Sequence, residues 1–238
     1  MTPGSVAADA LAGRLASIRE RVSRAAESAG RDPQGIHLLA VTKGHPASAV
    51  EAAVSLGLRE IGESRVQEAQ AKRAACPGRG ISWHMIGHLQ RNKARLAASL
   101  FDTVQSLDSA ALAVDLARHR GTDVAPLRVL IEVELTGLPG RTGTSPDDAA
   151  AVLEVVRGLA ALEPAGLMTV APPGPADAVQ LCFERLRELR EALRQTQGIA
   201  LEELSMGMSD DYEVAIAHGA TVIRLGRALF GDRPGPGR

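Results

Sequence analysis

The residues best suited to chemistry are a lysine behind an apolar run and an arginine and glycine segment near the other end of the chain. Lys43 closes the segment HLLAVTK after six residues without charge, and Arg224 and Gly226 lie in VIRLGRALFG. A free lysine has a pKa of about 10.4, so a nucleophilic lysine at neutral pH needs burial or a neighbouring cation. If the two segments meet, Arg224 is such a cation, and together they can hold a phosphorylated aldehyde.

The distal segment has the composition of an anion cradle. Gly226 and Gly231 flank an expected helix start after the last strand, and backbone amides at such a point bind phosphate. The segment is not a Walker loop, because Gly231 is followed by Asp232 and Arg233. Ser205, at the end of the preceding strand, can donate its hydroxyl to the same phosphate, and a capping or turn role is the equal alternative.

Eight short apolar runs define the architecture, because all but the last are followed by helical periodicity. The runs begin near His37, Arg59, Ser82, Asp102, Leu127, Ala165, Glu202 and Thr221. Strands that alternate with helices need right-handed crossovers and a parallel sheet. Eight such units with short connections favour an α/β fold, a single (β/α)8 TIM barrel, over the alternative of an open doubly wound sheet.

An extra N-terminal helix precedes the barrel, since four apolar residues are spaced along one helical face and charged residues fill other positions. The apolar residues are Leu11, Leu15, Ile18 and Val22. We expect this helix to cover the lower end of the barrel. The chain shows no linker, so we expect residues 1–238 to form one domain with frayed ends at 1–5 and 233–238.

Closure of the barrel is what brings the two chemical segments together. All strands of a parallel barrel open their carboxyl ends on one face, and the eighth strand lies beside the first. Lys43 therefore becomes a neighbour of Arg224 and Gly226. Barrels commonly bind phosphate on this face, after strands 7 and 8.

The composition limits the binding partners and the cellular compartment that we expect for this protein. A formal net charge of -1 and five aromatic residues give no basis for nucleic-acid binding. No apolar stretch approaches a membrane span and the N-terminus lacks a secretory pattern, so we expect a cytoplasmic protein without a membrane partner. Two cysteines, Cys76 and Cys182, suit a reducing compartment. No exposed apolar patch is evident, so we expect a monomer.

Two further clusters have simpler interpretations than a metal site. The acidic segment SDDYE at 209–213 opens an expected helix, where carboxylates cap the first turn and complement the helix dipole. His84 and His88 share one face if WHMIGH is a strand, but no third ligand converges with them in the sequence. We expect core or rim histidines and no bound metal.

The chain resembles a known family along nearly its whole length. The motifs that carry the resemblance are LLAVTKGHP, IGESRVQEA, WHMIGHLQRNK, GLMTVAPP, LSMGMSDDYEVAIAHGA and VIRLGRALFG. In order and spacing they are similar to those of the pyridoxal-phosphate homeostasis proteins, which are related to the N-terminal barrel of bacterial alanine racemase. The resemblance implies that pyridoxal 5'-phosphate (PLP) is the cofactor and that Lys43 holds it as a Schiff base. It further implies that Ser205, Gly226 and the Arg227 amide bind the phosphate and that Arg224 faces the pyridine nitrogen.

Four positions depart from the family pattern. Ser64 follows Gly-Glu where members usually have Asn, so a shorter hydroxyl replaces a side-chain amide at an expected cofactor contact. Arg227 stands where Thr is common, which matters little if the backbone amide is the donor. His88 replaces a frequent Pro, and Arg141 replaces Lys, which keeps the charge but removes a possible second carbonyl acceptor.

The expected role is a carrier rather than an enzyme. An arginine at the pyridine nitrogen leaves that nitrogen unprotonated, which makes the ring a poorer electron sink than a carboxylate partner would. The related racemases bring a tyrosine base from a second domain, whereas the one tyrosine here is Tyr212, in a helix start. We therefore expect a non-catalytic protein of PLP homeostasis that holds the cofactor and delivers it to apo-enzymes. The alternatives are a low-activity amino-acid racemase and a Schiff-base aldolase acting on a sugar phosphate.

Overall fold

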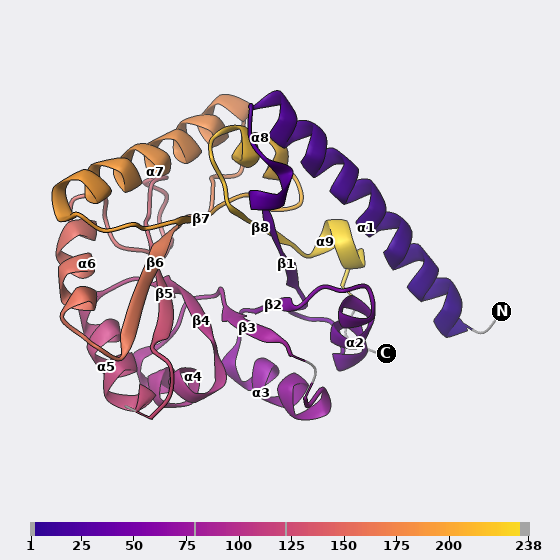
Figure 1. Ribbon diagram of the computed structural model, residues 1–238, viewed down its shortest axis with the longest axis horizontal. Helices are drawn as coiled ribbons and strands as arrows, with labels where there is room; N and C mark the ends of the chain where they lie inside the picture. The colour runs from indigo at the N-terminus through magenta and orange to yellow at the C-terminus, as the bar shows by residue number, and fades with distance from the viewer. Residues whose placement is uncertain (1–2, 79, 122, 234–238) are drawn as a thin grey trace.

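Eight parallel strands close into a barrel in the order in which they occur along the chain (Figure 1). The computed structural model describes residues 3–78, 80–121 and 123–233. The strands are β1 (His37–Val41), β2 (Glu60–Glu63), β3 (Ser82–Met85), β4 (Thr103–Leu107), β5 (Leu127–Glu132), β6 (Leu162–Met168), β7 (Glu203–Ser205) and β8 (Val222–Leu225). Closure is made by β1 and β8, where Leu39 lies opposite Arg224 and Ala40 opposite Leu225. The predicted (β/α)8 barrel is confirmed, and the open-sheet alternative is wrong.

Helices surround the barrel and cover the outer faces of its strands (Figure 1). The helices are α1 (Pro3–Ser28), α2 (Ala47–Ser55), α3 (Val66–Ala75), α4 (Ala94–Leu100), α5 (Ala110–Arg120), α6 (Ala149–Arg157), α7 (Ala176–Gln197), α8 (Tyr212–Ala217) and α9 (Arg227–Phe230). Short 3₁₀ turns at Pro33–Gly35 and Arg91–Lys93 precede β1 and α4. Within the described ranges, no helix is both long and apolar enough to cross a membrane.

The leading helix α1 lies on the outside of the barrel, against α8 and α9 (Figure 1). Its four predicted apolar residues are all buried. Arg14 Nε donates to the Leu229 carbonyl at 2.7 Å, and Arg21 pairs with Glu213 at 2.7 Å. The sequence led us to expect this helix at the lower end of the barrel. That expectation is wrong, because the apolar face of α1 packs on α8 and α9.

The structure describes part of the two ends that the sequence predicts to be frayed. Residues 3–5 belong to α1, and the Arg233 side chain has a defined place beside Gly44. The rest of those ends, residues 1–2 and 234–238, lie outside the described residues.

The core has two parts, one on each side of the sheet. The larger part fills the space between the strands and the helices. Inside the barrel, a small apolar cluster of Leu130, Ala165 and Met168 shares the space with buried polar side chains that include Gln105 and Arg224. Barrel interiors are usually filled by layers of apolar side chains, so this polar content needs an explanation beyond packing.

Candidate functional site

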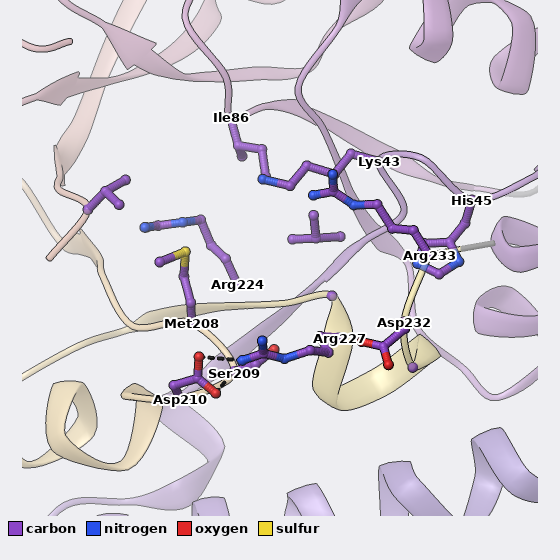
Figure 2. A pocket seen from close by; sticks show the side chains of 14 residues that line it. Lys43, His45, Ile86, Met208, Ser209, Asp210, Arg224, Arg227, Asp232 and Arg233 are labelled. Atoms are coloured by element: carbon purple, nitrogen blue, oxygen red, sulfur yellow. Dashed lines mark hydrogen bonds and ion pairs between the residues drawn. The ribbon is translucent and has the colours of Figure 1, made fainter. Parts of the chain in front are cut away.

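A cavity of about 540 Å³ opens at the carboxyl ends of the strands (Figure 2). Its wall comes from the segments that follow β1, β3, β6, β7 and β8, so residues far apart in the sequence meet there. The side chains of Lys43 and Arg224 extend into this space, and Ser209 and Gly226 also lie on its wall (Figure 2). The volume suits a small-molecule ligand. Barrel closure thus brings together the lysine, arginine and glycine that the sequence singled out.

Lys43 is half-buried on the loop that follows β1. Burial lowers the pKa of its amine, and the charges of Arg233 and Arg224 lower it further, against an opposing effect of Glu63. A lowered pKa increases the fraction of neutral amine, which is the nucleophilic form. The sequence predicts the contribution of Arg224 but not the larger one of Arg233.

A buried ionic cluster holds the backbone on both sides of the cavity lysine. Lys72 Nζ, on α3, donates to the Thr42 carbonyl at 2.6 Å. It also donates to Glu63 Oε1 at 2.6 Å and to Glu68 Oε1 at 2.7 Å. Glu68 Oε1 in turn accepts the Gly44 amide at 2.6 Å. The sequence hides this cluster, because Glu68 and Lys72 have the spacing of an ordinary surface pair on a helix.

Gly44 and Arg233 form the rim of the cavity beside the lysine. Gly44 has a φ of +76°, and a Cβ at this position would lie 2.9 Å from Arg233 Cδ, so both backbone and contact favour glycine here. Gly231, with a φ of +81°, turns the chain after α9 and lets Arg233 return to the loop after β1. No motif predicts this return, because it depends on the turn rather than on a fixed spacing.

The start of α9 and the loop after β7 meet at the cavity, where the sequence predicts an anion cradle. First-turn amides of a helix have no acceptor within it, and in α9 these belong to Arg227 and Ala228. The Ala228 amide donates to Ser209 Oγ at 3.0 Å, which holds the Ser209 hydroxyl at the same point. The Arg227 side chain turns aside to pair with Asp210 (Figure 2), so only its backbone amide is left for a ligand in the cavity.

Ser205 lies beneath the cavity rather than on its wall. Its side chain is fully buried, and Oγ accepts from Arg224 Nη1 at 2.8 Å while donating to Gln105 Oε1 at 2.6 Å. The other terminal nitrogen of Arg224 donates to the Thr169 carbonyl at 2.8 Å. Burial lowers the pKa of Arg224 to about 10, so the guanidinium is still protonated at neutral pH. The resemblance assigns Ser205 to the phosphate, and in the structure the Ser205 hydroxyl contacts Arg224, whereas Ser209 lies on the cavity wall.

Ser64 and Tyr212 are not among the described residues that line the cavity. A Cβ at Gly87 would lie 2.6 Å from the Ser64 carbonyl oxygen, so the loops after β2 and β3 pack tightly on each other. Ser64 is not among the described residues that line the cavity, which differs from the position that the resemblance implies. Tyr212 is buried with its ring 5.2 Å from the Arg21 guanidinium. It therefore faces α1 and offers no base to the cavity.

The two histidines of WHMIGH lie in different environments. His84 is buried in the barrel, whereas His88 is half exposed and pairs with Asp108 at 3.1 Å. In the part of the chain that the structure describes, no group of three or more His, Cys, Asp or Glu side chains could hold a metal ion. His84 is a core residue, and His88 lies at the surface.

Known proteins with similar sequences cover almost the whole chain. Residues 14–234 match the family model of the alanine racemase N-terminal domain. The pyridoxal phosphate homeostasis protein of Pseudomonas aeruginosa is 42% identical over 224 residues, which cover 94% of this chain and 96% of that protein. The protein of the same name from Escherichia coli is 37% identical over 228 residues, which cover 94% of this chain and 97% of that protein.

Solved structures share the barrel. PipY of Synechococcus elongatus with PLP bound matches with a TM-score of 0.81 and 41% identity, over 93% of this chain and 100% of that chain. Alanine racemase of Corynebacterium glutamicum matches with a TM-score of 0.66 and 19% identity, over 94% of this chain and 63% of that chain. At that identity, the likeness to the racemase shows the fold alone.

Proposed function

Because the chain belongs to the family of pyridoxal phosphate homeostasis proteins, we propose that it binds PLP reversibly and limits the free concentration of this reactive aldehyde. The observation that carries the proposal is a lysine of lowered pKa that shares one cavity with an anion cradle. Relatives named for this homeostasis and a related structure with PLP bound support it. The cofactor supplies an electrophilic carbonyl carbon and a ring that accepts electrons.

Each group on the cavity wall suits one part of this ligand. The neutral amine of Lys43 would bond to the aldehyde carbon, and the aldehyde oxygen would leave as water. The Ser209 hydroxyl and the amides of Gly226 and Arg227 bind the phosphate. Arg224, whose terminal nitrogens are anchored beneath the cavity, donates toward the ring nitrogen.

The same groups favour a holder over a catalyst. A ring nitrogen that faces the protonated Arg224 stays unprotonated, and such a ring stabilises a carbanion poorly. Two-base racemisation needs a second base across the ligand from Lys43, and Tyr212 is turned toward α1. We therefore propose a non-catalytic carrier that delivers PLP to apo-enzymes. The cytoplasmic location and the monomeric state stay predictions.

An absorbance titration tests the binding proposal. Adding PLP to protein stripped of cofactor should produce a saturable Schiff-base band. Lys43→Ala should abolish this band, whereas Lys93→Ala, on the turn Arg91–Lys93, is the matched control and should leave it unchanged. A wild-type protein without the band, or a Lys43→Ala protein that keeps it, refutes the proposal.

Two assays separate carrier from catalyst. Holoprotein incubated with L-alanine or D-alanine should leave the optical purity unchanged, and a measurable loss would show a racemase. Delivery is measured by mixing holoprotein with a PLP-dependent apo-enzyme while a phosphatase destroys free PLP. Activation of the apo-enzyme in the presence of the phosphatase indicates direct transfer, and activation that the phosphatase prevents contradicts it.

A further inference from the structure

A line of hydrogen bonds crosses the barrel interior and ends at the cavity arginine. It begins at Ser82 Oγ on β3, which lies 3.1 Å from His84 Nε2. His84 Nδ1 lies 3.1 Å from Gln105 Nε2 on β4. Gln105 Oε1 accepts from Ser205 Oγ on β7 at 2.6 Å, and Ser205 Oγ accepts from Arg224 Nη1 on β8 at 2.8 Å. Because β4 and β7 are not neighbours in the sheet, the line passes through the interior.

The arginine determines the direction of every bond in this line. A guanidinium can only donate, so Ser205 Oγ accepts from Arg224 and turns its single proton toward Gln105. The amide oxygen of Gln105 therefore faces Ser205, and its NH₂ group faces His84. This NH₂ group needs an acceptor, so His84 Nδ1 carries no proton. The neutral ring then has its proton on Nε2, which donates to Ser82.

The line is intact at neutral pH because His84 stays uncharged. Its side chain is 4% exposed, and burial, together with the charges of Arg128 and His37, lowers its pKa to about 3. A protonated ring would present an N–H to the Gln105 NH₂ group and break the order of donors and acceptors. Gln105 and Ser205 are fully buried, so their bonds are shielded from solvent.

We infer that Gln105 and His84 are positioning residues, which act through Ser205 to hold the Arg224 guanidinium ready for the ring nitrogen of PLP. This inference rests on the proposed function. Bonds to Ser205 and the Thr169 carbonyl use one N–H on each terminal nitrogen of Arg224 and leave its other N–H groups for a ligand. An arginine fixed in advance need not be ordered during binding. Apolar side chains would fill a barrel equally well, so packing does not require these polar residues. The need to hold Arg224 in place accounts for them.

Substitution of Gln105 in the intact protein tests the inference. Gln105→Leu removes the acceptor of the Ser205 proton and leaves the interior apolar. It should weaken PLP binding by up to about tenfold, the upper end for one hydrogen bond between neutral groups, and shift the visible band of bound PLP, while borohydride still labels Lys43. Val104→Ala is the matched control for lost packing, because this neighbouring side chain on β4 belongs to the core under the helices. It should change neither affinity nor band.

Gln105→Glu is the rescue variant. A carboxylate still accepts from Ser205, and a neutral His84 ring can carry its proton on Nδ1 and donate to it. We expect affinity and band close to those of the wild-type protein, with the changed His84 tautomer visible in ¹⁵N NMR spectra of the cofactor-free protein. Ser205→Ala removes a single oxygen atom and should reproduce the effects of Gln105→Leu, so a leucine variant that fails to fold leaves the test standing.

The possible outcomes separate this inference from the proposed function. If Gln105→Leu and Ser205→Ala bind PLP with wild-type affinity and band, the inference is overturned and the proposed function stands. The inference is also overturned if Gln105→Leu loses no more PLP affinity than Val104→Ala does, or if Gln105→Glu does not recover the wild-type affinity. If the wild-type protein does not bind PLP at Lys43, the proposed function fails and the inference fails with it.

Discussion

Removal of the Ser209 hydroxyl should weaken binding of the phosphorylated ligand alone. Ser209 Oγ lies on the cavity wall, accepts the Ala228 amide at 3.0 Å and keeps its own proton for a phosphate oxygen. A hydrogen bond to a charged group contributes about 1.5–3 kcal/mol, which corresponds to a roughly 10- to 150-fold change in Kd. Ser209→Ala should therefore raise the Kd for PLP by this factor.

Pyridoxal, which lacks the phosphate, is the control ligand for this prediction. In absorbance titrations, Ser209→Ala should lower the affinity for PLP and leave the affinity for pyridoxal unchanged. Ser55→Ala, at an exposed hydroxyl that donates to the Ala52 carbonyl in α2, should change neither affinity. Equal losses for the two ligands, or no loss for either, would refute the assignment of Ser209 to the phosphate.

Three further predictions concern charge and stability. Arg233→Gln removes a cation that lowers the pKa of Lys43, so half-maximal Schiff-base formation should move to higher pH; an unmoved midpoint contradicts this. Lys72→Met leaves the buried Glu63 carboxylate unpaired and should lower the free energy of unfolding in urea by about 3–5 kcal/mol; an unchanged midpoint argues against the ion pair. Folding lowers the pKa of His84 from 6.5 to about 3, so between these values the unfolded state binds more protons. Stability should fall as pH drops through that window, by at most ~1.4 kcal/mol per pH unit, and His84→Gln should flatten the profile. A slope that His84→Gln leaves unchanged contradicts the buried neutral ring.

The sequence predicts the order and pairing of the strands, but it does not predict the direction in which every side chain points. Alternating strands and helices require a parallel sheet, and eight of them can close only if the last strand pairs with the first. That pairing places Lys43 beside Arg224 and Gly226, and the observed register of β1 and β8 agrees. The meeting of these residues therefore follows from the chain order alone.

The two serines of LSMGMS show where prediction from the sequence stops. Ser205 ends β7 with its side chain inside the barrel, whereas Gly207, with a φ of +93°, turns the chain so that Ser209 reaches the start of α9. A shift of one residue in a strand reverses which side chains face inward, and an apolar pattern does not define such ends. Arg233 depends in the same way on the turn at Gly231.

The central claim is that Lys43 carries the cofactor, and borohydride reduction of the PLP-loaded protein followed by peptide mass mapping tests it most directly. The chain has three lysines, Lys43, Lys72 and Lys93, so the lysine that carries the cofactor can be identified. We predict a pyridoxyl group on the peptide that contains Lys43 and none in the Lys43→Ala protein. A label on Lys72 or Lys93 in place of Lys43, or a label that persists in Lys43→Ala, would contradict the account.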